Sequence, residues 1–385
     1  MTDPTPEALE GLRRKLDEID RHLVETLGER HGVVADVARL KSAGTTTIRD
    51  PERERAILER IGQLGAASGL EPGYVKRLYR LILDESVRVQ QEMLGRASSS
   101  TEGRLVVGYQ GGEGAFSHMA AMAHFQGRAS ELVFVGYPSF PAMLEAVRTG
   151  EIRYAVLPIE NSIAGSINEN YDLLARMDLH LVGEQVQRIE HCLIGLAEVP
   201  LHQIRRVYSH PVALAQCTAF LATLENCHVE AYQDTALSVA KIKEDQDLSQ
   251  AAIASEEAAR IHGLPVLRRD IANNRENYTR MVIVAREPVA VDPRVPCKTS
   301  VVLSLAHEQG ALSRSIHGLA SRGLNLTKLE SRPIPGRPFE YLFYVDFEGN
   351  VATSDVKGAL EELGRHTQSV RVLGTYPSHT PQREA

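Results

Sequence analysis

Apolar residues recur along the chain with more than one period. From residue 6 to about residue 95, leucine, isoleucine and valine return every three or four positions, the spacing that gathers them on one face of an α-helix. This spacing predicts a long first helix over 7–41 and a second from 51 to about 65, with Asp50 as its N-cap. A third helix is expected over 72–89. The first 95 residues should therefore form an all-helical domain.

The pattern changes after residue 103. Residues 96–103 are rich in serine and hold no large apolar side chain, which predicts a linker. Short apolar strands then alternate with helical stretches as far as residue 286, the pattern of an α/β fold, and we expect two lobes with a cleft between them. Residues 287–297 hold three prolines and few large side chains, which predicts a second linker.

The last part of the chain shows strands and helices in the order β-α-β-β-α-β, which is the ferredoxin-like arrangement. Its strands are expected at 298–305, 325–330, 341–347 and 370–373, and its helices at 310–319 and 356–363. The fold class is thus multidomain, α and α/β. The expected parts are a helical domain at 1–95, a linker at 96–103, a two-lobed α/β domain at 104–286, a linker at 287–297, a ferredoxin-like domain at 298–377 and a tail at 378–385.

Composition and charge narrow the function. With 43% apolar and 24% charged residues, the 385-residue chain is typical of a soluble globular protein and too long for one core. A net charge of -7 gives no general attraction for nucleic acid or an anionic membrane, and no apolar run approaches a membrane span. The first residues form no signal pattern, and the four cysteines have no metal-binding spacing. We expect a cytoplasmic protein with no metal and no nucleotide cofactor.

Basic residues on the first helix form a candidate anion site. Arg30 and Lys41 lie eleven residues apart on nearly the same face, about 16 Å along the axis. Arg13 lies about 25 Å before Arg30, so these two cannot share a small ligand within one chain. A helix this long has too little of its own chain to pack on, which favours a dimer in which Arg13 reaches the partner's site. On the third helix, Ser86 and Gln90 face the same way.

Short stretches with charged or polar residues recur through the helical domain at Leu12-Arg13, Glu29-Arg30, Lys41, Arg49-Asp50, Arg53-Glu54-Arg55, Asp84-Glu85-Ser86 and Gln90-Gln91. In these stretches and their spacing, the helical domain resembles the all-helical chorismate mutases. Chorismate is a dianion that rearranges without a cofactor, so the enzyme need only fold it and stabilise charge at the breaking ether oxygen. The resemblance implies a dimer and a site made of Arg13, Arg30, Lys41, Asp50, Arg53, Glu54, Ser86 and Gln90, with Lys41 and Gln90 as donors to the ether oxygen. The alternative is a solvated, charge-laced helix bundle.

Small polar residues follow the apolar strands of the middle region, where α/β folds place their chemistry. They are Glu160, Asn161 and Ser162 after one strand, Ser209 after another with Gln216 seven residues on, Thr235 at a helix start, and Asn277-Tyr278-Thr279-Arg280 before an apolar run. Each alone is equally typical of a helix cap. Together they closely resemble prephenate dehydratase, with matching stretches from residue 107 to residue 285. That domain looks like a periplasmic binding protein.

The resemblance implies an active site at Glu160, Asn161, Ser209, Gln216 and Thr279, with Ser162, Thr235 and Arg280 as substrate-binding neighbours. Prephenate must lose carbon dioxide and its ring hydroxyl, and the gain of aromaticity drives the reaction. A proton donor at the departing oxygen suffices. We expect Thr279 to be that donor, supported by Glu160 or by a network through Asn161 and Gln216, while Arg280 or helix N-terminal amides hold carboxylates. His118, His191 and His210 are expected to be packed hydrogen bonders.

Some residues depart from the usual dehydratase pattern. Val212 stands where glutamine is usual, Met281 stands where phenylalanine is usual, and the turn at 111–116 is unusually rich in glycine. The stretches at 109–111 and 170–172 also resemble plant-type arogenate dehydratases. Two alternatives therefore stand beside prephenate dehydration: arogenate as the preferred substrate, and a non-catalytic protein that responds to phenylalanine and controls another enzyme.

The ferredoxin-like part resembles an ACT domain of the phenylalanine-sensing kind, through the motifs at 310–313, 325–328, 330–333 and 343–349. The resemblance implies phenylalanine bound at a subunit interface, in a homodimer or homotetramer, with feedback inhibition as the result. The implied contacts are Gly310, Ala311, Leu312 and Ser313 together with Glu330, Ser331, Arg332 and Pro333. An ACT-like fold used only for dimerisation is the alternative. The whole chain is thus predicted to be a bifunctional enzyme that acts on chorismate and prephenate and is inhibited by phenylalanine.

Overall fold

The computed structural model describes residues 6–42, 51–98 and 104–378, apart from 292, 294, 307 and 335. The chain divides into two compact units, Met1–Ser100 and Thr101–Ala385, and each is described by itself. Among the described residues, no helix combines the length and the apolar character that a membrane crossing requires. Asp50, which we predicted to be an N-cap and a site residue, lies outside the described residues.

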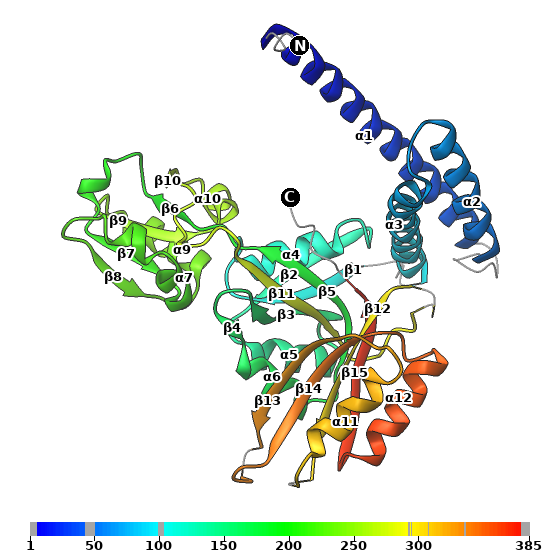
Figure 1. Cartoon of the computed structure of the whole chain (residues 1–385). Coiled ribbons are helices and arrows are strands. Elements are labelled where there is room, and N and C mark those ends of the chain that lie inside the picture. Colours follow the sequence, from blue (N-terminus) through cyan, green and yellow to red (C-terminus); the bar gives the residue numbers. More distant parts are fainter. Residues whose placement is uncertain are drawn as a thin grey trace. The chain divides into compact units, whose positions relative to one another are not determined.

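Three helices form the first unit: α1 (Pro6–Ser42), α2 (Pro51–Ala67) and α3 (Pro72–Ser98) (Figure 1). All three predicted helices are therefore present. The buried core of the unit lies between α2 and α3, at Ile61, Leu83, Val87 and Val89. Gly65 lets the two helices approach, because a Cβ there would lie 2.8 Å from a methyl carbon of Val75.

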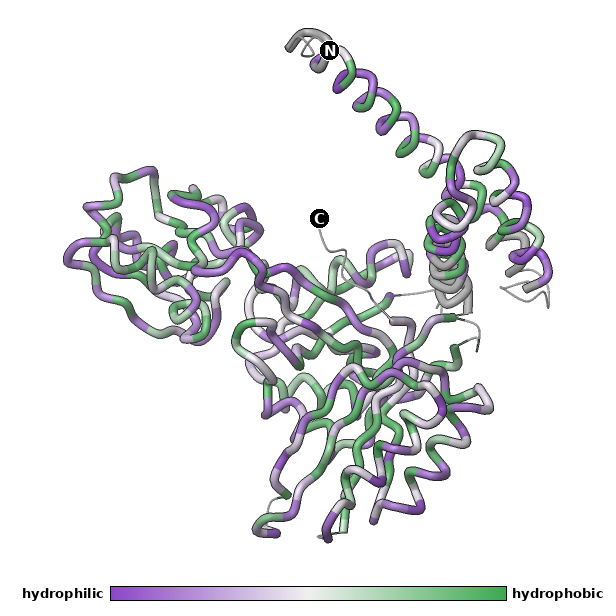
Figure 2. The backbone as a smooth tube through the Cα atoms, in the orientation of Figure 1, coloured by the Kyte–Doolittle hydropathy of each residue, from purple (hydrophilic) through white to green (hydrophobic). Residues whose placement is uncertain are grey.

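Much of α1 carries apolar side chains that are exposed in the single chain. Their exposed fractions range from 39% to 68%, and Figure 2 shows the apolar positions recurring along this helix between hydrophilic ones. The exposed residues are Leu12, Leu16, Ile19, Leu23, Val24, Leu27, Val33 and Val37. A stripe of this length on one helix is typical of a surface that another helix covers.

The second unit begins with a lobe built on a six-stranded sheet, in the order β2-β1-β3-β11-β5 with β4 beside β3. Helix α4 covers one face of this sheet, around Val107, Val156 and Ile283. The elements of the lobe are β1 (Arg104–Gln110), α4 (Phe116–Phe125), β2 (Glu131–Tyr137), α5 (Phe140–Thr149), β3 (Tyr154–Asn161), β4 (Gly165–Ser166), α6 (Asn168–Arg176), β5 (His180–Arg188) and β11 (Tyr278–Ala285).

The second lobe is built on a five-stranded sheet, in the order β10-β6-β9-β7-β8. Its elements are β6 (Cys192–Gly195), the short helix η1 (Leu201–Gln203), β7 (Arg206–Ser209), α7 (Pro211–Gln216), α8 (Thr218–Leu221), β8 (His228–Ala231), α9 (Thr235–Asp245), β9 (Gln250–Ala254), α10 (Glu256–His262) and β10 (Val266–Arg268). The chain passes between the lobes twice, from β5 to β6 and from β10 to β11. The predicted two-lobed α/β arrangement is confirmed.

The C-terminal module has the predicted β-α-β-β-α-β order, with its sheet in the order β13-β14-β12-β15. Helices α11 and α12 cover one face of this sheet (Figure 1). The other face packs on the first lobe, where Tyr344, Leu373 and Tyr376 share one apolar core with Leu157 and Leu181. The elements are β12 (Cys297–Ser304), α11 (Ala311–Ala320), β13 (Leu326–Pro333), β14 (Tyr341–Glu348), α12 (Ser354–Arg365) and β15 (Ser369–Pro377).

Candidate active site

Strands β3 and β11 bring Asn161 beside Thr279. The two strands are antiparallel neighbours and these two residues pair in register, so both side chains leave the sheet on the same face. Asn161 Nδ2 donates to Thr279 Oγ1 at 3.0 Å and to Asn277 Oδ1 at 2.8 Å. All three residues are buried. They form a polar cluster at the end of β3 and the start of β11, where we expected the catalytic residues.

Backbone amides fix which way the Asn161 side chain points. Its Oδ1 accepts hydrogen bonds from the backbone N–H groups of Ile163 at 3.0 Å and Ala164 at 2.8 Å. A backbone N–H can only donate, so the oxygen of Asn161 faces these groups and its nitrogen faces Thr279. Because Asn161 is the donor in that bond, the hydroxyl proton of Thr279 is left for another acceptor.

Gln216 extends the cluster to His191. Gln216 Nε2 donates to Asn161 Oδ1 at 3.3 Å, and its Oε1 accepts from Asn277 Nδ2 at 2.9 Å and lies 2.9 Å from His191 Nε2. An amide oxygen carries no proton, so the proton of the last bond belongs to His191 Nε2. Burial lowers the pKa of His191, although its bond to Gln216 acts in the opposite direction. The imidazole is therefore a neutral donor that holds Gln216. We call Asn161, Gln216, Asn277, Thr279 and His191 the amide network.

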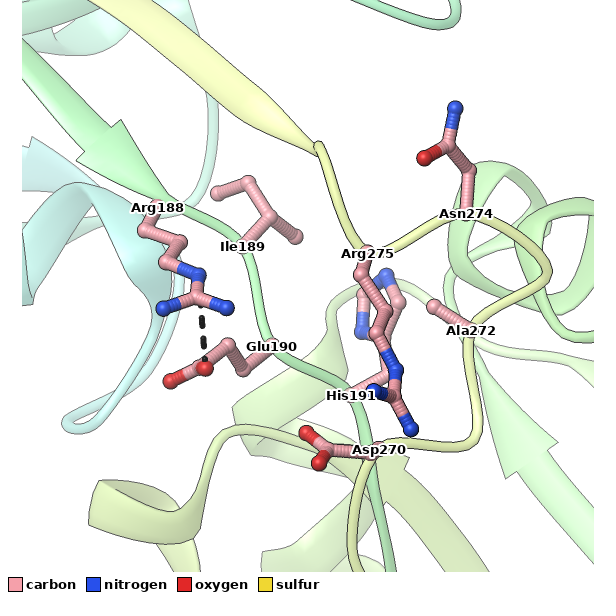
Figure 3. Close-up of a pocket in the computed structure, with 8 residues that line it drawn as sticks. All are labelled: Arg188, Ile189, Glu190, His191, Asp270, Ala272, Asn274 and Arg275. Atoms are coloured by element: carbon pink, nitrogen blue, oxygen red, sulfur yellow. Dashed lines mark ion pairs between the residues drawn. The ribbon is translucent and has the colours of Figure 1, made fainter. Parts of the chain in front are cut away.

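The amide network meets the two connections between the lobes. A pocket here is lined by both connections, as Figure 3 shows, and its residues are Arg188, Ile189, Glu190, His191, Asp270, Ala272, Asn274 and Arg275. Arg188 and Glu190 form an ion pair across part of its wall at 3.4 Å. His191 belongs to both the pocket and the amide network, so it links the polar cluster to the hinge of the two lobes.

Glu160 lies on the opposite face of β3 from Asn161, because successive side chains of a strand alternate between faces. Its carboxylate forms an ion pair with Lys328 of β13 at 2.9 Å. We predicted two possible supports for Thr279, namely Glu160 or a network through Asn161 and Gln216. The structure does not bring Glu160 to Thr279, whereas Asn161 bonds to Thr279 and Gln216 bonds to Asn161.

Arg280 follows Thr279 in β11, so its side chain leaves the sheet on the same face as Glu160, opposite to Asn161 and Thr279. Its guanidinium binds Glu184 at 2.8 Å, Asp346 at 2.5 Å and the Tyr376 hydroxyl at 2.9 Å. Burial opposes its charge, but Tyr376, Asp346 and Glu184 together raise the pKa of Arg280 above its ordinary value. We expected this arginine to hold a substrate carboxylate. In the structure its guanidinium group already binds two carboxylates of the protein.

Three other predicted residues belong to the two lobes. Ser209 is fully buried at the end of β7, and its Oγ donates to the Ile253 carbonyl at 2.6 Å. Ser162 Oγ accepts from the backbone N–H of Tyr278 at 3.0 Å, which ties the turn after β3 to the start of β11. Thr235 is buried in the first turn of α9. The hydroxyls of Ser209 and Ser162 are thus engaged with the backbone.

The glycine-rich turn forms a contact between the lobes. Gly111 and Gly114 have φ of +101° and +86°, and a Cβ on Gly114 would lie 2.5 Å from the Cα of Ala258 in α10. The carbonyl of Gly114 accepts from Ser255 Oγ at 2.6 Å, and its N–H donates to His118 Nδ1 at 3.0 Å. Only glycine fits this turn, and His118 is a packed hydrogen bonder, as expected.

In the helical unit, α1 and α3 bring Arg30 to Ser86. Arg30 Nη1 donates to Ser86 Oγ at 2.5 Å, and Gln90 Nε2 donates to the Ser86 carbonyl at 3.2 Å. Gln90 is buried, and its Oε1 has no hydrogen-bond partner among the described residues. These three predicted residues therefore come together, with polar groups available to a ligand.

Other predicted residues of the helical domain are placed apart or are not described. Arg13 lies on α1 about 25 Å from Arg30 along the axis and is exposed. Arg53 and Glu54 lie in the first turn of α2. Lys41 belongs to α1, but its side chain is outside the described residues. Within one chain, Arg13 does not join the Arg30 cluster.

The C-terminal module has a pocket beside the start of α11. It is lined by Leu305, Ala306, Glu308, Ala311, Leu312, Phe339, Glu340, Tyr341 and Phe343. Ser331 and Pro333 of β13 pair in register with Phe343 and Tyr341, so they leave the sheet on the same face as those rings. Glu330 and Arg332 leave on the face that packs on the first lobe. The predicted effector motif is therefore divided between two faces.

Sequence reasoning missed two residues of these clusters. Asn277 lies two positions before Thr279 in extended chain, and the period of two would have placed both side chains on one face. Lys328 reaches Glu160 only through the packing of one domain on another, and no local pattern signals such a contact. In the described part of the chain, no group of three or more His, Cys, Asp or Glu residues is arranged to hold a metal ion.

The chain thus combines a helical unit that carries an arginine–glutamine cluster, two α/β lobes with a buried threonine, and a C-terminal β-α-β-β-α-β module, which is the domain order of a mutase–dehydratase. Comparisons with known proteins agree. Residues 12–91 match the family "Chorismate mutase type II", and residues 107–289 match the family "Prephenate dehydratase".

Relatives and solved structures extend this match to nearly the whole chain. The chain is 36% identical to the bifunctional chorismate mutase/prephenate dehydratase of Escherichia coli, over 98% of each chain. It is 41% identical over 74% of its length to arogenate dehydratase/prephenate dehydratase 2 of Arabidopsis thaliana, of which it covers 75%. The crystal structure of prephenate dehydratase in complex with L-Phe from Arthrobacter aurescens matches with a TM-score of 0.65 and 32% identity, over 71% of this chain and 90% of that one.

The chain belongs to the family of bifunctional chorismate mutase/prephenate dehydratases. It is an enzyme with chorismate mutase and prephenate dehydratase activities and acts in phenylalanine biosynthesis.

Proposed function

We propose that prephenate is dehydrated at the amide network, with Thr279 as the proton donor. The bond between the ring and its carboxylate breaks, and the electron pair enters the ring as carbon dioxide leaves. The ring C–O bond breaks toward oxygen, and the departing hydroxide takes the Thr279 hydroxyl proton and leaves as water, while Thr279 regains a proton from solvent water. The single observation that carries this assignment is the orientation of Asn161, which donates to Thr279 Oγ1 and so aims the hydroxyl proton elsewhere.

The rest of the network has a positioning role in this proposal. Gln216 and Asn277 fix Asn161, and neutral His191 fixes Gln216 through its Nε2 proton. Because burial lowers the pKa of His191, the ring does not act as a cationic acid at neutral pH. Because these residues are buried, each of the bonds is stronger than it would be in water.

Variants of Thr279 test the assignment. Thr279→Ala should lower dehydratase kcat by 100-fold or more, about the contribution of a positioned proton donor, while Thr279→Ser should retain much of it because the hydroxyl remains. Mutase activity of the same preparations is the internal control, since the helical unit is separate. Retained dehydration by Thr279→Ala would refute the role of Thr279.

For the mutase we propose a site made by two chains. Arg30, Ser86 and Gln90 cluster within one chain, and Arg13 is too distant to join them. The exposed apolar stripe of α1 would be covered in a homodimer, which would carry the partner's Arg13 to the cluster. We assign Lys41, Asp50, Arg53 and Glu54 to the same site. Mixing inactive Arg13→Ala and Lys41→Ala chains should restore part of the mutase activity, and no recovery would contradict the shared site.

We propose that phenylalanine binds at the pocket beside α11, between subunits. The apolar and aromatic lining suits its side chain. Ala311 and Leu312 line the pocket, and Ser331 and Pro333 leave the sheet on its face. The proposed parts of the chain remain a mutase domain at 1–95, a dehydratase domain at 104–286 and an ACT domain at 298–377. Leu312→Asp should abolish inhibition by phenylalanine and leave uninhibited dehydration intact, whereas unchanged inhibition would place the effector elsewhere.

Prephenate is the proposed dehydratase substrate, and arogenate is the second candidate because the plant relative carries both names. Val212, one of the departures from the usual pattern, is 42% exposed in α7. The ratio of kcat/KM for the two substrates decides between them. We also propose a cytoplasmic location, because Cys192, Cys217 and Cys227 are free thiols in the structure.

A further inference from the structure

Lys328 of the C-terminal module reaches the back of the catalytic strands. Its Nζ lies 2.9 Å from the Glu160 carboxylate and donates to Ser166 Oγ at 3.0 Å. Only 10% of the Lys328 side chain is exposed, and its ammonium lies 5.7 Å from the centre of the Tyr171 ring. Burial and three partners hold this ammonium in one place.

Two of the partners of Lys328, Glu160 and Ser166, lie opposite each other on the hairpin that carries Asn161. Glu160 in β3 pairs in register with Ser166 in β4. Between them, the turn is held on its other side by Asn161 Oδ1, which accepts from the amides of Ile163 and Ala164. One side of the hairpin is therefore fixed by Lys328 and the other by the amide network.

The strand that carries Lys328 also borders the proposed effector pocket. Lys328, Glu330 and Arg332 alternate toward the first lobe, where Glu330 bonds to Ser166 and Arg332 binds Asp172 at 2.8 and 3.0 Å. Ser331, between them in sequence, leaves on the opposite face, the face of the pocket. If a ligand in the pocket displaces β13, the side chains on the other face of this strand, Lys328, Glu330 and Arg332, must move with it.

We propose that Lys328 is a positioning residue for dehydration, which holds the β3–β4 hairpin through Glu160 and Ser166 so that Asn161 keeps its bond to Thr279. In this role Glu160 is the anchor of that contact and does not exchange a proton with the substrate. Lys328 is then also the group through which a shift of β13 reaches the reacting centre. The inference rests on the dehydratase function proposed for Thr279.

The test is Lys328→Met in the full chain, which keeps the length of the side chain and removes its charge. Dehydratase kcat should fall about tenfold, as expected for a small displacement of a catalytic group, while KM for prephenate stays within about twofold, because Lys328 does not touch the substrate. Lys328→Arg should restore most of kcat. Lys357→Met, the same change at an exposed position of α12, should match the parent.

A second measurement reads the hairpin directly. Hydrogen exchange at the amides of Ile163 and Ala164 should be faster in Lys328→Met than in the parent and in Lys357→Met. The fraction of dehydratase activity removed by saturating phenylalanine should also shrink in Lys328→Met. Unchanged kcat and unchanged exchange beside an active parent would overturn the role of Lys328, and so would a loss that Lys328→Arg does not rescue. A parent without dehydration would instead refute the function proposed for Thr279.

Discussion

Replacing Arg280 by methionine would remove the central cation of a buried charge cluster. Only 13% of the Arg280 side chain is exposed, and its carboxylate partners Glu184 and Asp346 are 0% and 9% exposed. Glu184 keeps a second cation, because Lys298 Nζ lies 2.9 Å from it. Asp346 loses the cation at 2.5 Å that compensates its charge in the interface between the first lobe and the C-terminal sheet.

The expected loss of unfolding free energy depends on how many buried carboxylates lose their cation. Removing one partner of a buried ion pair costs about 3–5 kcal/mol, since the other charge stays buried without compensation. Because Glu184 retains Lys298, we expect the lower end, about 3 kcal/mol, which lowers the folding equilibrium constant by about two orders of magnitude. Adding Asp346→Asn to the variant should recover part of the loss, because it removes the uncompensated charge.

Equilibrium urea denaturation of the full chain, followed by tyrosine fluorescence, measures this effect. Arg148→Met is the matched control, because Arg148 also lies 2.5 Å from a carboxylate, that of Glu145, but with side chains that are 54% and 47% exposed. An exposed pair of this kind contributes about 1 kcal/mol or less. Equal losses for Arg280→Met and Arg148→Met would refute the reasoning that burial makes the Arg280 cluster critical.

Three further predictions concern other parts of the molecule. Burial lowers the pKa of His191 below its usual 6.5, so the unfolded chain binds a proton at higher pH than the folded chain, and the free energy of unfolding falls as pH drops below about 6.5. Between pH 7.5 and pH 5.5, the free energy of unfolding should fall less for His191→Asn than for the parent. An equal fall would contradict the assignment of a neutral ring. Gly114→Ala should destabilise the contact between the lobes by about 1–3 kcal/mol and lower dehydration but not mutase turnover, since φ is +86° and a Cβ would meet Ala258; normal dehydratase kinetics would show that the turn is unimportant. Leu23→Asp on the exposed stripe of α1 should disrupt the proposed dimer contact of the helical unit, seen as a smaller assembly in analytical ultracentrifugation, and abolish mutase activity. An unchanged, active assembly would place the interface elsewhere.

The helices and the order of the strands were predictable because they depend on local periodicity. The three helices of the first unit start where Pro6, Pro51 and Pro72 stand, and the C-terminal module has the order of elements that its strand patterns indicate. Some of the residues predicted for the dehydratase site also lie on or next to two adjoining strands, β3 and β11. Among them, Asn161, Gln216 and Thr279 are joined by hydrogen bonds.

The face of the sheet on which each strand residue lies was not predictable from the sequence. Alternation requires Glu160 and Asn161 to point in opposite directions, but it does not say which of them joins the amide network. That choice depends on the packing of the C-terminal sheet on the first lobe, which surrounds Glu160 with Lys328 and Arg280 with Asp346. Glu160 was predicted to support Thr279 and Arg280 to hold a substrate carboxylate, and in the structure both serve contacts between domains.

Incubation of the purified chain with chorismate alone tests the central claim most directly. Prephenate and phenylpyruvate are followed over time by chromatography, with and without phenylalanine. The account predicts that prephenate appears first, that phenylpyruvate follows, and that phenylalanine slows the second step. Prephenate that accumulates without phenylpyruvate would contradict the assignment of prephenate dehydration to Thr279 and its network.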